Sequence, residues 1–216
     1  MTLKIWGRAS SSNVQPVMWC IGELGLPHER IDVGGKFGGL ETEEFRSLNP
    51  NGKIPVLQDG ELIVWESRAI LRYLAAEYGD ETFWPEAPRN RAPIDQWLEW
   101  AKTTIDEALI TGVFWGYWRT PKAERDMETV HRHWTDVNAA MAKADARLEE
   151  RAFLCGDDLT LADIGFGYLL YRYFTLPLTR PDRPNLAAYY QRLTDRQPYR
   201  EHIMIDYHEL FGRLDF

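Results

Sequence analysis

The chain of 216 residues can form one large domain or two ordinary ones, and its 44% hydrophobic content can supply a sizeable core. Its formal net charge of −8, without any block of Lys or Arg, argues against nucleic acid and anionic membranes as partners. Cys20 and Cys155 have no CxxC spacing and no nearby His cluster, so no metal site or disulfide framework is indicated and buried free thiols are expected. No apolar run reaches the roughly 18 residues of a membrane span and no signal-peptide core is present, which predicts a cytoplasmic protein.

The first eighty residues mix strand and helix patterns and predict an α/β domain at 1–80. Asp59-Gly60 between two apolar runs is the strongest short hairpin signal. In chain order, the expected elements are a strand at 3–6, a helix at 14–24, a strand at 29–33, a short helix at 42–48, strands at 55–58 and 62–65, and a helix at 67–78.

The second half lacks strand patterns and predicts an all-helical domain at 94–216, after a proline-rich linker at 81–93. Apolar residues recur at helical spacing over 94–105 and over 130–148. Thr160 and Asp163 form a capping box that opens a third helix. Two shorter helices are expected at 185–195 and 198–206.

A run of polar side chains, Ser10 to Asn13, stands between the first strand and the first helix. The N-terminal end of a helix carries roughly half a positive charge, so a thiolate held there is stabilised. A serine hydroxyl donating to the sulfur adds about 1.5–3 kcal/mol, which is enough to lower a thiol pKa by one unit. An ordinary helix N-cap is the alternative interpretation of the same residues.

The segment Asn49–Leu57 brings Pro55 to the start of a strand, where it cannot donate to the ladder. If the Ile54–Pro55 bond is cis, the backbone of Ile54 turns outward and its N–H and C=O can pair with an extended peptide ligand. Lys53 beside it can then meet a carboxylate of that ligand. A plain trans turn with a solvated lysine is the alternative, because only about 5–6% of X–Pro bonds in folded proteins are cis.

Glu66 and Ser67 stand at the start of the helix expected at 67–78. Backbone N–H groups in a first helical turn face outward and bind carboxylates, while Glu66 can pair with an ammonium. One amino-acid head group carries both charges. The alternative is again a capped helix with an exposed acid. Taken together, the three features describe a site for a short, extended, thiol-bearing peptide with a free amino acid at one end.

The motifs "SSSNVQPVMW", "LNPNGKIPVLQDG", "ESRAILRYLAAEYG" and "LTLADI" resemble those of the cytosolic glutathione transferases, closest to the serine-type classes around theta and their bacterial members. The resemblance covers the whole chain. It implies a thioredoxin-like α/β first domain, an all-α second domain, a homodimer, and detoxifying conjugation of glutathione, the co-substrate, to a small-molecule electrophile.

The resemblance also implies roles for single residues. Ser11 or Ser12 would donate to the glutathione sulfur, with Asn13 as a polar neighbour. The glutathione-binding residues would be Lys53 near the glycine carboxylate, Ile54 before a cis Pro55 at the cysteinyl backbone, and Glu66, Ser67 and Arg68 at the γ-glutamyl end. Pro16 stands where relatives often carry a basic residue, and its fixed φ suits an early helical position.

The electrophile site is expected near the aromatic run that includes Phe114, Trp115 and Trp118, unless these rings are core. The same activated thiol would also serve a glutathione-dependent disulfide reductase or peroxidase, and the sequence does not separate these reactions. A non-catalytic glutathione-binding or scaffold protein is the third interpretation, although a scaffold has no need for a ligand clamp.

Overall fold

Four short strands form one mixed sheet near the beginning of the chain. The computed structural model describes residues 2–214. The strands β1 (Leu3–Trp6), β2 (His28–Ile31), β3 (Val56–Asp59) and β4 (Leu62–Trp65) lie in the order β2-β1-β3-β4. β1 runs parallel to β2 and antiparallel to β3, and β3 pairs with β4 through the expected hairpin, in which Asp59 lies opposite Leu62.

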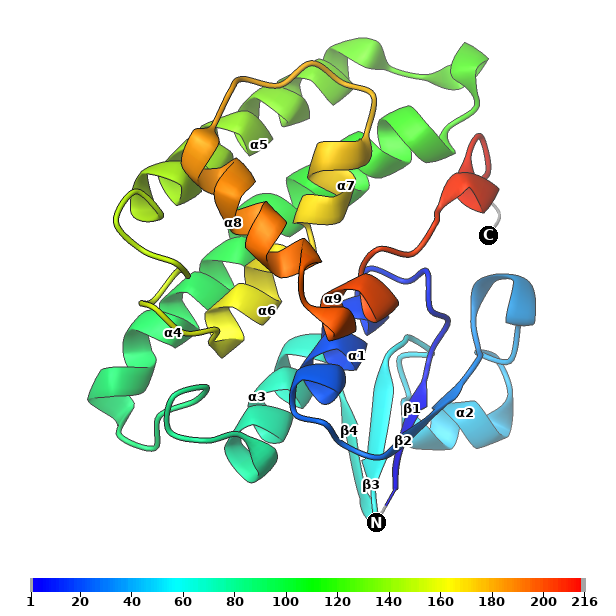
Figure 1. Ribbon diagram of the computed structural model, residues 1–216. Helices are drawn as coiled ribbons and strands as arrows, with labels where there is room; N and C mark the ends of the chain where they lie inside the picture. The colour runs from blue at the N-terminus through cyan, green and yellow to red at the C-terminus, as the bar shows by residue number, and fades with distance from the viewer. Residues whose placement is uncertain (1, 215–216) are drawn as a thin grey trace.

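Three helices complete this first domain in the predicted order β-α-β-α-β-β-α. They are α1 (Val14–Glu23), α2 (Glu43–Leu48) and α3 (Ser67–Tyr78), with a single turn, η1 (Gly35–Phe37), in the glycine-rich loop. α1 and α3 lie on the side of the sheet that faces the second domain, whereas α2 lies on the other side (Figure 1). The thioredoxin-like α/β domain expected from the resemblance is confirmed.

Every helix or strand assigned to the second domain within residues 2–214 is a helix, as predicted. Figure 1 shows its helices gathered beside α1 and α3, and none of the helices described is long and apolar enough to cross a membrane. The elements are α4 (Pro88–Trp100), η2 (Ala101–Arg119), η3 (Lys122–Glu124), α5 (Met127–Arg147), α6 (Leu161–Gly167), α7 (Leu170–Thr175), α8 (Pro184–Thr194), α9 (Gln197–His202) and η4 (His208–Leu210).

Helix α4 begins at Pro88, inside the segment expected to be a linker at 81–93. The prolines of that segment suggested a break. Pro88, however, occupies the first helical turn, where its missing N–H costs nothing and its fixed φ suits the helix. Pro93 lies inside the helix as well. The connection between the domains is therefore shorter than the composition indicated.

Helix α4 continues directly into η2, which is wound in the wide π register. At its end, the Thr120 N–H donates to the carbonyl of Trp115, five residues earlier. Buried side chains of η2 recur every four or five residues, at Ala101, Ile105, Leu109–Ile110, Val113–Phe114 and Trp118–Arg119. A template of 3.6 residues per turn does not fit this spacing, and this explains why the sequence analysis followed the helix only to residue 105.

The predicted capping box at the start of α6 is present. The buried Asp163 carboxylate accepts from the Thr160 N–H at 2.8 Å and the Thr160 hydroxyl at 2.9 Å, and also from the Leu154 N–H and the Tyr189 hydroxyl, each at 2.9 Å. The carboxylate thus ties a loop, a helix start and α8 together. Thr160 and Asp163 are folding residues, as the resemblance implied.

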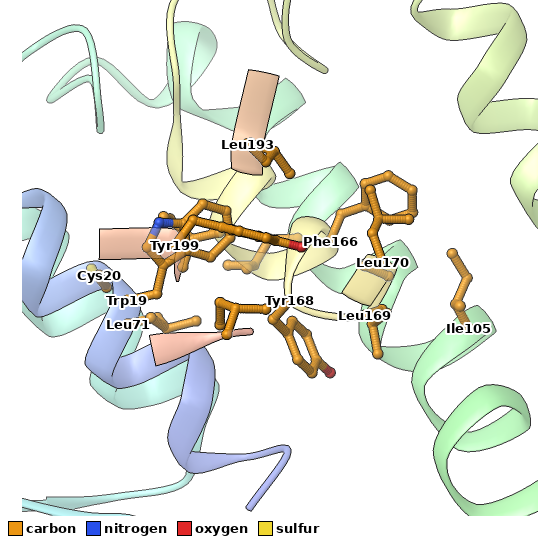
Figure 2. Close-up of a cluster of buried hydrophobic side chains, with 14 of the residues drawn as sticks. Trp19, Cys20, Leu71, Ile105, Phe166, Tyr168, Leu169, Leu170, Leu193 and Tyr199 are labelled. Carbon is orange, nitrogen blue, oxygen red and sulfur yellow. The ribbon is translucent and has the colours of Figure 1, made fainter. Parts of the chain in front are cut away.

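The two domains share one hydrophobic core. Figure 2 shows Trp19 and Cys20 of α1 and Leu71 of α3 meeting side chains of the second domain. The rings of Trp19 and Tyr199 contact edge to face with 4.9 Å between centroids. Because α1 packs on α9 and α6 as well as on α3, the loop that precedes α1 is held at the boundary between the domains.

Candidate active site at the domain boundary

Two adjoining cavities open between the serine loop, the segment before β3 and the second domain. The larger has a volume of about 240 Å³ and the smaller about 150 Å³, and both are lined by Asn13, Lys53 and Ile54. The smaller cavity is further lined by Asn49, Pro55, Glu66, Ser67 and Lys102. The larger is further lined by Arg8, Ser10, Ser11, Ser12, Leu40, Gly52, Ile110, Phe114, Trp115, Arg119, Arg172 and Leu210.

The serine loop places two hydroxyls at the N-terminal end of α1. Ser11 is held by its backbone: its N–H donates to the Arg8 carbonyl at 3.2 Å, and its carbonyl accepts from the N–H groups of Val14 and Gln15, each at 3.0 Å. Ser11 is 8% exposed, and Ser12 is half-buried beside it. Neither hydroxyl makes a hydrogen bond within residues 2–214, so each can donate to a ligand in the cavity.

Asn13 is linked to the second domain through a residue that the sequence analysis missed. Its Oδ1 accepts a hydrogen bond from Lys102 Nζ of η2 at 3.1 Å, rather than from the first turn of its own helix. Lys102 also pairs with Asp106 at 2.7 Å, and Asp106 accepts from the Tyr168 hydroxyl. The spacing of four residues between Lys102 and Asp106 predicts an ion pair along one helix face. No pattern in the sequence predicts the contact between Lys102 and Asn13.

The peptide bond between Ile54 and Pro55 is cis, as the resemblance implied. The loop before it is shaped by the buried Asn49, whose Nδ2 donates to the Lys53 carbonyl at 2.7 Å and whose Oδ1 accepts from the Asn51 N–H at 3.0 Å. Ile54 makes no backbone hydrogen bond to any described residue. Its N–H and C=O are therefore available to an extended ligand along the cavity wall.

Glu66 and Ser67 face the smaller cavity from the start of α3. Glu66 has φ of 70° and is the one non-glycine residue with positive φ between residues 2 and 214. A backbone conformation of this kind lowers the stability of the fold by about 1–3 kcal/mol, and residues that adopt it are concentrated at ligand-binding positions. It turns the chain from β4 into α3 so that the carboxylate of Glu66 and the first helical turn at Ser67 meet the same space.

Arg68 does not line either cavity, against the expectation that it holds the γ-glutamyl end. It is buried between the domains, where its Nη2 donates to the Gly165 carbonyl at 2.9 Å and its guanidinium lies 5.5 Å from the centre of the Tyr168 ring. One residue beyond Ser67 on a helix points about 100° away from it. Arg68 therefore joins α3 to α6.

Of the three aromatic residues predicted for the electrophile site, Phe114 and Trp115 line the larger cavity and Trp118 does not. Trp118 is buried; its Nε1 donates to the Tyr207 carbonyl at 3.2 Å, and its ring packs on Phe211. The wide turn of η2 puts positions 114 and 115 toward the cavity and 118 against the C-terminal segment.

Neither cysteine takes part in the cavities. Cys20 and Cys155 are free thiols, Cys20 inside α1 and Cys155 in the loop before α6. Burial raises the pKa of the Cys20 thiol far above its usual range, and burial followed by the nearby Asp163 raises that of Cys155 to about 11. Both thiols are thus protonated near neutral pH, and the expectation of inert, free cysteines agrees with their surroundings.

Comparison with known proteins matches the chain to two family models. The glutathione S-transferase N-terminal domain matches residues 1–76, and the C-terminal domain matches residues 127–192. The chain is 40% identical over 205 residues to glutathione S-transferase GstB of Escherichia coli, covering 94% of this chain and 98% of GstB. Glutathione S-transferase 3 of Zea mays is 31% identical over 195 residues, covering 86% of this chain and 83% of the relative.

A solved structure is similar over nearly its whole length. It is the theta class glutathione S-transferase of Xanthomonas axonopodis pv. citri with glutathione bound, which is 42% identical with a TM-score of 0.89 and covers 95% of this chain and 98% of its own.

Proposed function

The chain belongs to the glutathione S-transferase family, and on that premise we propose how the residues of its cleft carry out the transfer of glutathione to an electrophile. Glutathione is the co-substrate. The smaller cavity holds its γ-glutamyl end, the edge at Ile54 holds the cysteinyl unit, and the larger cavity receives the sulfur and the electrophile.

The γ-glutamyl head group meets three charged or polar side chains in the smaller cavity. Its ammonium pairs with the Glu66 carboxylate, and its carboxylate accepts from the Ser67 hydroxyl and from N–H groups in the first turn of α3. Lys102 adds a cation to the same cavity from the second domain. A zwitterion fits this pattern because both of its charges find an opposite one.

The middle of the peptide pairs with the backbone of Ile54, as a strand adds to an exposed edge. This fixes the cysteinyl residue beside the serine loop, since Ile54 lines both cavities. Lys53, exposed at the same place, meets the glycine carboxylate.

Ser11 is the donor that activates the sulfur. One observation carries the proposal. The buried residue Ser11 lies at the N-terminal end of α1 in the cavity wall, and its hydroxyl has no hydrogen-bond partner within residues 2–214. Such a donor stabilises a thiolate by about 1.5–3 kcal/mol, and the helix end adds to it. Ser12 and Asn13 are its polar neighbours.

In the reaction, the thiol proton passes to water and the sulfur remains as a thiolate beside Ser11. The thiolate attacks the electrophilic carbon, a new C–S bond forms, and the leaving group departs with the electron pair of the broken bond. The protein contributes thiolate stabilisation and alignment of the two reactants, which together lower the barrier.

We further propose a homodimer in the cytoplasm. Leu62 and Trp65 are exposed on β4, which is an edge strand, and Tyr78 is exposed near the turn that starts it. Apolar side chains grouped at a sheet edge favour a partner surface. Two free cysteines suit a reducing compartment.

The test is a difference spectrum of glutathione bound to the wild type, Ser11→Ala and Ser12→Ala across pH. We expect Ser11→Ala to bind glutathione but to lose thiolate absorbance near neutral pH, while Ser12→Ala retains most of it. Wild-type binding without ionisation would contradict the serine mechanism. A parallel rate panel with an aryl halide, a hydroperoxide and a small disulfide separates the reactions; turnover of the disulfide alone would contradict conjugation.

A further inference from the structure

The larger cavity gathers positive charge in a protein that is negative as a whole. The chain carries a formal net charge of −8. The lining residues nevertheless include four cationic side chains and, within residues 2–214, no Asp or Glu. The four are Arg8, Lys53, Arg119 and Arg172. One of them, Lys53, is accounted for by the glycine end of glutathione under the proposed function, which leaves three arginines at the electrophile's part of the cleft.

Arg172 is the most informative of the three. It comes from α7 and is 2% exposed, yet it lines the cavity. Its guanidinium donates to two neutral oxygens, Gln15 Oε1 at 2.6 Å and the Ser10 carbonyl at 3.2 Å. No ion pair joins it to a carboxylate of residues 2–214, and its buried Nε has no hydrogen-bond partner there. A guanidinium stays charged in proteins, so this is a buried cation without a direct ion pair in that part of the chain, and the Asp106 carboxylate acts on it only over a longer distance.

The other two arginines extend the positive wall. Arg119 is also 2% exposed. Its guanidinium carbon lies over the Trp115 ring, 3.9 Å from the ring centre, and its Nε donates to the Arg213 carbonyl at 3.0 Å. Arg8 lines the same cavity from the loop after β1. Burial lowers the pKa of Arg8, and the nearby Glu209 partly opposes this effect; Glu209 is itself paired with Lys36 at 2.7 Å.

Apolar side chains also line this larger cavity. Leu40, Ile110, Phe114, Trp115 and Leu210 line the same cavity of about 240 Å³. A small carbon skeleton fits against them, and a planar carboxylate matches the fork of a guanidinium, which binds it through two parallel hydrogen bonds. A neutral apolar electrophile would leave Arg172 without a direct ion pair.

We propose that the electrophile half of the cleft selects a small electrophile that bears a carboxylate, with Arg172 as the main anchor. The proposal rests on the proposed glutathione transferase function. The glutathione thiolate attacks a carbon next to the carboxylate and forms the C–S bond. The leaving group, such as a halide, departs with the bonding pair, and the thiol proton has already passed to water.

Iodoacetate and iodoacetamide make a matched pair of probes, because they share the reacting carbon and the leaving group and differ in charge. For each, kcat/KM at saturating glutathione is divided by the rate constant of free glutathione at the same pH. We expect the wild type to accelerate iodoacetate about tenfold more than iodoacetamide, the factor that one charge-assisted hydrogen bond supplies. Arg172→Gln should abolish this preference while iodoacetamide is still turned over.

Arg8→Gln is the second variant, since Arg8 is less deeply buried and its loss is better tolerated than that of Arg172. It should reduce the preference several-fold. Arg200→Gln, an exposed arginine on α9 outside both cavities, is the matched control and should leave it unchanged.

Equal acceleration of the two probes by the wild type would overturn the carboxylate selection while the transferase function stands. An unchanged preference in both cleft variants would also overturn it. If neither probe nor chlorodinitrobenzene is turned over, the proposed function itself fails, so the two failures are distinguishable.

Discussion

Lys102 Nζ donates to Asn13 Oδ1 over 3.1 Å and so connects η2 of the second domain to the serine loop of the first. The ammonium is also oriented by Asp106 at 2.7 Å. Glutathione bound between Ser67 and Ile54 would meet this ammonium at one end of the smaller cavity. The proposed glutathione site is therefore built by both domains rather than by the first alone.

Lys102→Met should raise KM for glutathione roughly five- to tenfold, because a partly exposed charge-assisted hydrogen bond to the ligand is lost. The effect on kcat should be smaller, since we propose that the sulfur binds at Ser11 and not at Lys102. Steady-state kinetics with glutathione as the varied substrate measure both. Lys143→Met, at an exposed lysine of α5, is the control. An unchanged KM in Lys102→Met would remove Lys102 from the binding site.

Gly165→Ala should destabilise the protein. A Cβ at Gly165 would meet Leu98 Cδ1 of α4 and lie 2.6 Å from Arg68 Nη1. Overpacking of this kind costs about 1–3 kcal/mol, which exceeds the helix propensity of up to about 1 kcal/mol that alanine gains over glycine. The midpoint of urea unfolding should fall with an unchanged slope.

Gly156→Ala is the matched control for this substitution, because a Cβ at Gly156 meets no atom within 4 Å. Its unfolding midpoint should stay at the wild-type value. A wild-type midpoint for Gly165→Ala would contradict the tight contact of α6 with α4 and α3.

Cys155 should react slowly with a disulfide reagent at pH 8. Its pKa is raised from 9.0 to about 11, mainly by burial and then by Asp163. Two pKa units mean about 100-fold less thiolate than an ordinary cysteine has at this pH. The rate should then rise about tenfold per pH unit up to the raised pKa. Absorbance of the released thiolate measures it, with the urea-unfolded chain as the fast-reacting reference.

The same shift has a consequence for stability. Because the pKa of Cys155 is higher in the folded chain than in the unfolded one, the neutral thiol favours the folded state. This contribution to the free energy of unfolding is complete below pH 9 and is lost as the pH rises toward 11. Fast labelling of the native protein at pH 8 would contradict both statements.

Leu62→Glu should dissociate the proposed homodimer. The added charge would stand on the apolar edge of β4, where burial against a second copy is costly. Light scattering at micromolar concentration should give twice 25.2 kDa for the wild type and a mass near 25.2 kDa for the variant. Met204→Glu, an exposed apolar position after α9, should remain dimeric. A wild-type mass of 25.2 kDa would contradict the dimer.

Local patterns were sufficient for most elements of the fold. The apolar spacing of α1, the Asp59-Gly60 hairpin and the Thr160–Asp163 capping box are each decided by residues close in sequence, and each is confirmed. The part of the wide helix η2 beyond residue 105 and the short α7 were missed. The buried positions of η2 follow no 3.6-residue repeat, and α7 has only six residues and no side-chain cap.

The sequence predicted the first-domain residues of the candidate site but not those of the second domain. Ser11, Ile54, Glu66 and Ser67 lie in motifs of the first domain, and the structure brings them to adjoining cavities. Lys102 and Arg172 reach the same cleft from segments about ninety and 160 residues away from the serine loop. No local pattern encodes a contact over such a separation; it follows from the packing of α1 against the second domain.

The packing of α1 under α9 also constrains the order of events during synthesis. Trp19 contacts Tyr199, and the Glu23 carboxylate accepts from Arg196 Nη2 at 2.6 Å. A nascent chain that has released only its first eighty residues from the ribosome still exposes this apolar side of α1. Residues 197–202 must emerge before that side is covered. The thioredoxin-like domain can therefore cover the apolar side of α1 only late in translation.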